Sequence, residues 1–161
     1  TRLSDGLEGL KAGEGDTLVI AGMGGPLMEK ILTEGNEVLQ TVTELVLQPQ
    51  SEIGHFRRFL IENGYEITHE EMILEDGKYY PIMRAVHGKA KEQTEAEYLY
   101  GKNLLQNRNP VLKEFLDREQ VKAEELLEKL KNSQTPSAKA RISELEKEWK
   151  DRKEALTYYE V

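Results

Sequence analysis

The chain has 161 residues and a formal net charge of −8, with 38% hydrophobic and 32% charged residues. This composition is typical of a soluble globular protein that forms one medium domain, or one small domain with an appendage. No apolar run is long enough to span a membrane, and the absence of cysteine excludes disulfides and cysteine-based zinc sites. We therefore expect a cytoplasmic protein without membrane association.

The charge is unevenly distributed along the chain. Residues 1–89 contain 8 Lys/Arg and 15 Asp/Glu, a net charge of −7, whereas residues 90–161 contain 14 and 15, a net charge of −1. Neither part is the basic surface expected of a protein that binds nucleic acid mainly through phosphates. An RNA partner would have to be held by local contacts.

The first residues, 1–4, are interpreted as the end of a strand, followed by a turn at Asp5 and Gly6 and a short helix over residues 8–12. The chain has no initiator methionine and opens inside this strand-like segment. We therefore expect it to be the later part of a longer protein.

Residues 17–32 form the central pattern of the chain. The apolar run at 17–21 predicts a strand buried on both faces, the glycines at 22–25 predict a sharp turn, and Pro26 suits the first turn of a helix. This order gathers free N–H groups at the carboxyl edge of a parallel sheet, where open α/β folds bind ligands. The alternative is that the glycines only let the helix pack tightly against the strand.

This glycine pattern does not match the dinucleotide-binding fingerprint. Leu27 occupies the position of the third glycine, and the next strand, residues 45–47, ends in Gln48-Pro49-Gln50 without a carboxylate. A nicotinamide or flavin cofactor is therefore disfavoured.

The following elements predict how the sheet ends. A helix is expected over residues 51–61 with Ser51 as its N-cap, and two strands over 65–74 and 79–86 flank an Asp-Gly turn. A parallel series that closes in an antiparallel hairpin is typical of S-adenosylmethionine-dependent methyltransferases, which have a Rossmann-like sheet.

Several short motifs, in matching order and spacing, resemble the bacterial tRNA (adenine-N1)-methyltransferase family (TrmK type) over roughly residues 2–86. They are Ala21-Gly22-Met23-Gly24-Gly25, Leu47-Gln48-Pro49-Gln50, Arg57-x-x-Leu60, Gly64-Tyr65-x-Ile67 and Gly77-x-x-Tyr80. The resemblance implies an α/β fold, with residues 1–89 as the C-terminal part of a Rossmann-like methyltransferase domain. It also implies methylation of N1 of an adenine in the D-arm region of tRNA, with S-adenosylmethionine as the methyl donor.

The family's first strand and its glycine loop, which hold most of the cofactor, have no counterpart in this sequence. We therefore expect negligible methyltransferase activity from the 161 residues alone. Adenine N1 is a neutral nitrogen with a free lone pair, so the chemistry needs alignment of the reactants and no general base.

The resemblance and the expected geometry together suggest roles for individual residues. The expected catalytic residues are Gly22, Met23, Gly24, Gly25, Gln48 and Pro49, and the expected cofactor-binding residues are Asp5, Gly6, Ala21 and Gly22. For Asp5, which matches an acidic position beside the cofactor's adenine, capping of the local turn is the alternative. Met23 is equally interpretable as a core residue, and both glutamines as residues of a solvated loop.

Gln50, Arg57 and Tyr80 are the expected substrate contacts of this domain. Arg57 could hold a phosphate, or pair with a glutamate of its own helix. Tyr80 could instead pack on a neighbouring strand. The three histidines show no metal-binding spacing, and no metal is expected.

Residues 90–161 have the pattern of a helical coiled-coil domain. Thr94 begins a capping box, and Asn109-Pro110 and Thr135-Pro136 are cap-then-proline starts of two long helices. Each long helix carries one stripe at heptad spacing. The stripes are Leu112, Leu116, Glu119, Ala123, Leu126 and Leu130 in the first helix, and Ala138, Ile142, Leu145, Trp149, Arg152 and Leu156 in the second.

Two stripes joined by a short polar loop predict an antiparallel hairpin, in which Glu119 pairs with Arg152. If the hairpin holds tRNA, its basic residues are expected to contact phosphates. These residues are Lys139, Arg141, Lys147, Lys150 and Lys153.

Two alternative functions are another Rossmann-type methyltransferase or nucleotide-binding enzyme, and a non-enzymatic scaffold whose coiled coil binds a partner. The oligomeric state stays open, with a monomer favoured.

Overall fold

The computed structural model describes residues 1–160, and the chain divides into two compact units with the boundary between Gln93 and Thr94. This boundary falls four residues after the one expected from sequence. In the described range, no helix is both long and apolar enough to cross a membrane.

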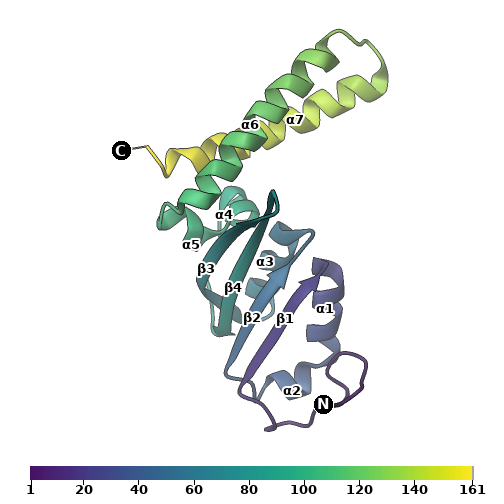
Figure 1. The fold of residues 1–161 in the computed structure, drawn as a ribbon, viewed down its shortest axis with the longest axis vertical. Helices are drawn as coiled ribbons and strands as arrows, with labels where there is room; N and C mark the ends of the chain where they lie inside the picture. Colours follow the sequence, from purple (N-terminus) through teal and green to yellow (C-terminus); the bar gives the residue numbers. More distant parts are fainter. Residues whose placement is uncertain (161) are drawn as a thin grey trace. The chain divides into compact units, whose positions relative to one another are not determined.

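The first unit is a four-stranded sheet with helical crossovers (Figure 1). Its elements are β1 (Thr17–Met23), α1 (Gly25–Glu34), α2 (Asn36–Leu39), β2 (Glu44–Pro49), α3 (Ile53–Glu62), β3 (Tyr65–Glu75) and β4 (Lys78–His87). The strand order is β1-β2-β4-β3, in which β1 and β2 are parallel and β4 is antiparallel to both of its neighbours. The parallel pair followed by an antiparallel hairpin is the arrangement predicted from the sequence.

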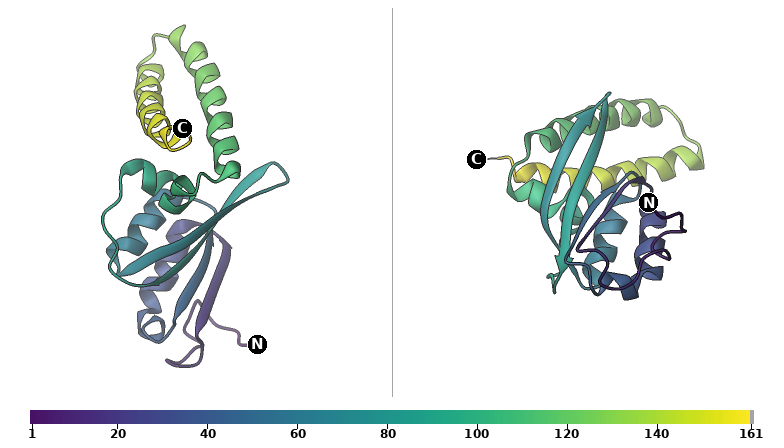
Figure 2. Two further views of the ribbon diagram at one scale, coloured as in Figure 1. Left: turned by 90° about the vertical axis from the view of Figure 1, so that its left-hand side faces the viewer. Right: turned by 60° about the horizontal axis from the view of Figure 1, so that its bottom comes forward.

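Helices α1 and α3 contact each other and cover the same face of the sheet (Figure 2). The core lies between them and the strands, and its fully buried members include Met28, Phe56, Leu60, Leu47 and Met83. On the opposite face of β1, Val19 is 63% exposed. The prediction that this strand is buried on both faces was therefore wrong. The physical reason is that α1 and α3 both lie on the same face of the sheet.

Two local predictions in this unit were also wrong. Residues 1–16 form turns and bends without the expected strand end or short helix. Helix α3 begins at Ile53 and follows Glu52, which has a left-handed backbone (φ 48°) and gives no side-chain cap. Ser51 is therefore not the N-cap of α3, and its carbonyl oxygen accepts a hydrogen bond from the N–H of Gly25 at 3.0 Å.

The β3–β4 hairpin extends past the end of β2. Strand β4 pairs with β2 only from Met83 to Ala85, but it pairs with β3 as far as Lys78, which lies opposite Glu75. Because β4 runs antiparallel to β2, the hairpin turn lies at the edge of the sheet where β1 and β2 end. The overhanging residues 78–82 are therefore close to any site at the carboxyl edge.

The second unit is helical, with α4 (Glu95–Tyr100), α5 (Lys102–Gln106), α6 (Pro110–Lys131) and α7 (Pro136–Thr157). The predicted caps are present: Thr94 forms a capping box with Glu97, and Asn109 and Thr135 accept bonds from the first turns of α6 and α7. Helices α6 and α7 run antiparallel and pack together (Figure 1). Every residue of the two predicted stripes is buried or half-buried.

The predicted ion pair between Glu119 and Arg152 does not form. Arg152 is 5% exposed and donates to the side-chain oxygen of Gln120 at 3.3 Å, while Glu119 pairs with Lys122 on its own helix at 2.9 Å. The intrahelical pair keeps its charges partly in solvent, which avoids the desolvation of a buried one. The polar contact between Arg152 and α6 is therefore made to the side-chain amide of Gln120 and not to Glu119.

Candidate functional site

Backbone hydrogen bonds join the ends of β1 and β2. The N–H of Gln50 donates to the carbonyl oxygen of Met23 at 2.8 Å, and the N–H of Gly25 donates to that of Ser51 at 3.0 Å. Parallel strands end at the same edge of a sheet, so residues distant in sequence meet there. The structure therefore brings together the glycine turn (residues 22–25) and the segment 48–50, as the sequence predicted.

The three glycines of this turn are needed for different reasons. Gly22 has φ +77°, and nothing lies within 4 Å of the position that a Cβ would take. A Cβ at Gly24 would lie 2.8 Å from the Ser51 hydroxyl, and one at Gly25 would lie 2.6 Å from the Ser51 carbonyl oxygen. Gly24 and Gly25 therefore permit close packing, whereas Gly22 leaves open space at the end of the sheet.

The side chain of Gln48 is held by this turn. Its carbonyl oxygen accepts a hydrogen bond from the N–H of Gly22 at 2.8 Å, and its amide nitrogen lies 3.4 Å from the carbonyl oxygen of Pro49. The amide group is thus engaged by the backbone on both sides. This geometry favours a role in fixing the turn over direct reading of a base edge.

A pocket of about 250 Å³ adjoins the same edge of the sheet. Pro49, Gln50 and Ile53 form one side of it, and Lys78, Tyr79 and Tyr80 from the overhanging end of β4 form the other. The structure therefore places Tyr80 near Gln50, two residues whose roles were predicted separately. Lys78 also lines this pocket and was not among the residues selected from the sequence, although it directly follows the Asp-Gly turn of the hairpin.

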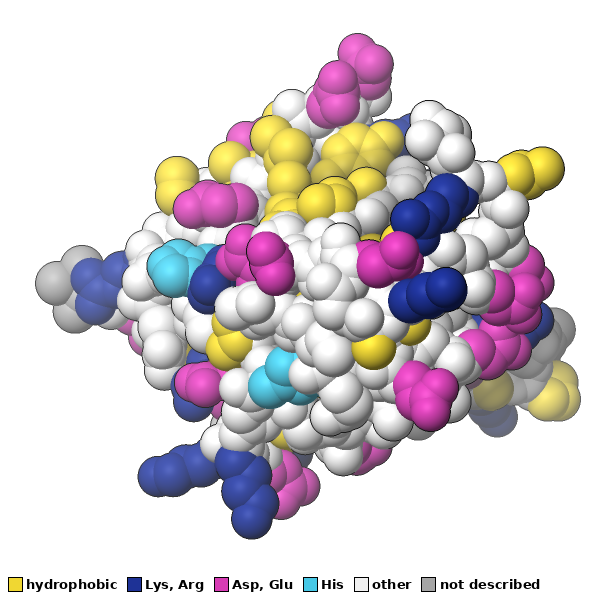
Figure 3. Space-filling view, turned by 90° about the horizontal axis from the view of Figure 1, so that it is seen from below, with side chains coloured by type: hydrophobic (Ala, Val, Ile, Leu, Met, Phe, Trp, Pro, Cys, Tyr) yellow, Lys and Arg dark blue, Asp and Glu magenta, His cyan; other side chains and the backbone are white. Residues whose placement is uncertain are grey.

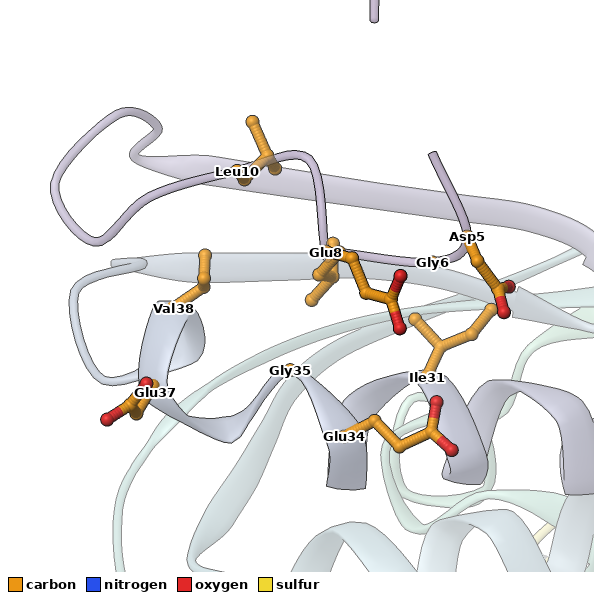
Figure 4. A pocket seen from close by; sticks show the side chains of 10 residues that line it. Asp5, Gly6, Glu8, Leu10, Ile31, Glu34, Gly35, Glu37 and Val38 are labelled. Atoms are coloured by element: carbon orange, nitrogen blue, oxygen red, sulfur yellow. The ribbon is translucent and has the colours of Figure 1, made fainter. Parts of the chain in front are cut away.

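The other expected cofactor residues, Asp5 and Gly6, line a different pocket of about 360 Å³ (Figure 4). Its wall includes the second half of α1, where Ile31 lies 3.6 Å from the Cβ position of Gly6. The charged residues of the lining are all acidic, and no residue of the glycine turn contributes to it. In this structure Asp5 and Gly6 are therefore grouped with α1, and Ala21 and Gly22 with the end of β2.

Arg57 lies inside the first unit. It is 1% exposed, and its Nε donates to Oε1 of Glu70 at 2.8 Å, with both side chains almost fully buried. A buried guanidinium that is held by a carboxylate does not reach a phosphate at the surface. Its burial supports a structural role, with a partner in β3 in place of the expected glutamates of its own helix.

The histidines also have structural contacts. His55 lies 2.7 Å from a carboxylate oxygen of Glu29, and His87 contacts the carbonyl oxygens of Leu39 and Val42 at 2.8 and 3.1 Å. Among residues 1–160, no cluster of His, Asp or Glu could hold a metal ion.

The basic residues of α7 differ in their partners. Arg141 donates to Glu144 at 2.9 Å and to Glu148 at 3.3 Å, and the hydrogen bond to Glu144 raises its pKa. The other four, namely Lys139, Lys147, Lys150 and Lys153, are exposed and have no carboxylate within 4 Å in the described part of the chain. Figure 3 shows a different face, seen from below the view of Figure 1, on which acidic and basic side chains are interspersed and form no continuous basic surface.

Comparison with known proteins places these features in a family. Residues 1–154 match the model of the tRNA (adenine(22)-N(1))-methyltransferase family. The chain is 41% identical over 87 residues to the Bacillus subtilis (strain 168) protein of that name, a match that covers 54% of this chain and 37% of that protein. This sequence match thus spans less than half the length of the curated relative.

Two solved structures are similar over most of the chain. The crystal structure of the B. subtilis m1A22 tRNA methyltransferase TrmK is 31% identical, with a TM-score of 0.81 over 96% of this chain and 69% of that one. A Streptococcus pneumoniae protein in complex with S-adenosyl-L-methionine is 29% identical, with a TM-score of 0.79 over 96% of this chain and 67% of that one. The chain, with its Rossmann-like α/β sheet, belongs to the tRNA (adenine(22)-N(1))-methyltransferase family.

Proposed function

We propose that this chain forms part of an enzyme that transfers a methyl group from S-adenosylmethionine to N1 of adenine 22 in tRNA. The observation that carries the proposal is the family match over residues 1–154, which includes the glycine turn and the end of β2. The S. pneumoniae relative in complex with S-adenosyl-L-methionine supports the choice of donor. The hydrogen-bonded turn at the carboxyl edge of the sheet is where this fold class binds ligands.

The residues at this edge fit such a cofactor. The open space at Gly22 and the exposed Ala21 beside it allow a ligand to approach the backbone closely. Away from this edge, in the pocket against α1, the exposed carboxylate of Asp5 can accept a hydrogen bond from an exocyclic amine. Ala21 and Gly22 at this edge are thus residues that would hold the cofactor, and the family resemblance adds Asp5 and Gly6 from the pocket against α1. The cofactor supplies a methyl group bonded to a positively charged sulfur.

Catalysis of this reaction depends on the alignment of the two reactants and needs no proton transfer. As the bond between adenine N1 and the methyl carbon forms, the carbon–sulfur bond breaks, and the positive charge passes from sulfur to the base. N1 loses no proton, so no general base is required. The glycine turn leaves room for the two reactants to meet, and Gln48 holds that turn in one conformation.

The test is methyl transfer from labelled S-adenosylmethionine to tRNA transcripts that carry adenine or guanine at position 22. Because the chain covers 69% of the B. subtilis crystal structure, the assay uses a chimera in which it replaces the matching residues of that enzyme. We expect label only in the adenine transcript. A folded chimera that transfers no methyl group, beside an active parent enzyme, would contradict the proposal.

The 161-residue chain alone is measured in the same assay. The sequence leads us to expect negligible transfer from it, since the family's first strand and glycine loop would be supplied only by the chimera. Methyl transfer by the chain alone at the rate of the chimera would overturn that expectation while leaving the proposed reaction intact.

A further inference from the structure

We propose that the pocket between the end of β2 and the tip of the β3–β4 hairpin binds the RNA backbone beside the methylated base. In this proposal Lys78 contacts a phosphate, and the ring of Tyr80 contacts the ribose or base of the same nucleotide. The inference rests on the proposed function and extends it to residues that form the wall of the site.

The position of the pocket follows from the strand register. Gln50 lines the pocket, and its N–H is bonded to the carbonyl oxygen of Met23 in the glycine turn. The pocket is therefore next to the turn, on the side of β2 that faces β4. A nucleotide in this pocket would be adjacent to a base held at the glycine turn.

The size of the pocket suits part of a polymer. Its volume of about 250 Å³ is below the roughly 300–1,000 Å³ of sites that enclose a whole small molecule. One ribose-phosphate or one unstacked base can enter while the rest of the strand stays outside. Unpaired nucleotides commonly bind in this way, with bases against aromatic rings and phosphates against basic side chains.

The charge of the unit makes Lys78 distinctive. Residues 1–89 have a net charge of −7, and several of their basic side chains are already paired with carboxylates. Lys78 is exposed, and in residues 1–160 no carboxylate lies within 4 Å of it, not even that of Glu75, which is opposite in the strand register. Its ammonium group is thus available to an anion in this pocket at the end of β2.

Tyr80 supplies the second contact. It is half-buried in the wall of the pocket, and its strand partner Ile73 is 48% exposed at the same overhanging end. A partly exposed tyrosine ring offers a flat apolar face with a hydroxyl at its edge. This combination matches a ribonucleotide, which presents a flat base and a 2′-hydroxyl.

The experiment measures the affinity of the chimera for the tRNA transcript as a function of KCl concentration. Loss of one phosphate contact lowers the slope of log K against log [salt] by about 0.7–0.9. We expect this change in Lys78→Ala, with the ratio of wild-type to variant affinity falling about threefold between roughly 50 and 200 mM KCl. Lys78→Arg should restore the slope, and the affinity for S-adenosylhomocysteine should not change in either variant.

Lys11→Ala is the matched control, because Lys11 is an exposed lysine in the loop that precedes β1, at the opposite edge of the sheet. Its slope should equal that of the wild type. For the ring, Tyr80→Leu should raise the KM for tRNA severalfold at unchanged kcat, whereas Tyr80→Phe should have a smaller effect.

The outcomes separate this inference from the proposed function. An active chimera in which Lys78→Ala leaves the salt slope unchanged would overturn the phosphate contact while the methyltransferase reaction stands. An equal loss of slope in Lys11→Ala would show a general charge effect and would also overturn it. A chimera without activity counts against the proposed reaction, and the binding data then test the RNA contact by themselves.

Discussion

The side-chain oxygen of Gln48 and the N–H of Gly22 form a hydrogen bond of 2.8 Å that links the ends of β2 and β1. The two residues are 26 positions apart in the chain. Gly22 has φ +77°, a conformation that residues with a side chain rarely adopt. The hydrogen bond to the side chain of Gln48 stabilises this unusual backbone conformation. The turn is therefore preorganised by a residue of the neighbouring strand.

This bond predicts different effects for two substitutions of Gln48. Gln48→Leu removes the acceptor and leaves the Gly22 N–H without it, whereas Gln48→Glu keeps an oxygen in the same place. A hydrogen bond of this kind contributes about 0.5–1.5 kcal/mol, so kcat for methyl transfer by the chimera should fall up to about tenfold in Gln48→Leu. The glutamate variant should retain more activity. Equal kcat values for Gln48→Leu and the wild type would contradict the positioning role.

Gly24 and Gly25 should respond differently to added side chains. The Cβ of Gly25→Ala would meet the backbone oxygen of Ser51 at 2.6 Å, which cannot move without shifting the start of α3. We expect a loss of about 1–3 kcal/mol in the free energy of unfolding, measured by denaturant titration. In Gly24→Ala the neighbour is the rotatable Ser51 hydroxyl, so stability should change less.

The larger Gly24→Val should abolish methylation by the chimera while unfolding stays cooperative, because its branches occupy space near the turn. Near wild-type activity of Gly24→Val would remove Gly24 from the reactive site. A non-cooperative unfolding transition would show instead that its role is packing.

Short-range patterns predicted much of this molecule. The glycine turn, the hairpin turn at Asp76 and the caps of α6 and α7 depend on neighbouring residues, and the structure contains them. The meeting of the turn with segment 48–50 followed from the rule that parallel strands end at one edge. Local chemistry and this one topological rule are therefore sufficient to bring the turn and segment 48–50 of the candidate site together.

The missed features depend on contacts that no local pattern records. Serine is a common N-cap residue, but Ser51 does not cap α3. Its carbonyl oxygen accepts a hydrogen bond from the N–H of Gly25, 26 residues earlier. Arg57 was expected to hold a phosphate or to pair with a glutamate of its own helix, and only the pairing of β3 with the sheet brings Glu70 to it. The one-sided burial of β1 required the positions of both helices. Long-range contacts decided each of these cases.

The ion pair between Arg57 and Glu70 should be a strong determinant of stability in the first unit. Both side chains are at most 2% exposed and their atoms are 2.8 Å apart. Removal of one partner leaves a buried charge, which typically costs about 3–5 kcal/mol. Arg57→Met and Glu70→Leu should each lower the free energy of unfolding by that order, and the double variant should recover much of the loss. Additive losses in a double-mutant cycle would argue against coupling.

The lysines of α7 are expected to contact tRNA phosphates. Lys150 and Lys153 are three residues apart, which places them on one face of the helix, and both are exposed. The double substitution to alanine should lower the slope of log K against log [salt] by about 1.4–1.8, with cofactor affinity unchanged. Arg141→Ala is the comparison and should have a smaller effect, because Arg141 already pairs with Glu144 and Glu148. Equal effects of the two variants would contradict a specific contact surface.

Tyr159 gives the helical unit a dependence on alkaline pH. Its hydroxyl donates to the carbonyl oxygen of Asn109 at 2.8 Å, and burial raises its pKa to about 12. The ordinary value is about 10, so folding favours the protonated phenol, and this contribution is fully present below about pH 10. It is lost as the pH rises from there to about 12, where an ionised phenol can no longer donate to Asn109. The unfolding midpoint of the chain, followed by helical circular dichroism, should therefore fall over this interval.

Tyr159→Phe should be less stable than the wild type at neutral pH and should show a shallower decline in alkali. Tyr158→Phe is the comparison, because the Tyr158 hydroxyl donates to Glu97 at 3.1 Å and its pKa is raised as well, first by burial. If the wild type and Tyr159→Phe decline in parallel, ionisation of Tyr159 is not the cause. A decline that disappears only in Tyr158→Phe would assign the pH dependence to the contact between α4 and the end of the chain.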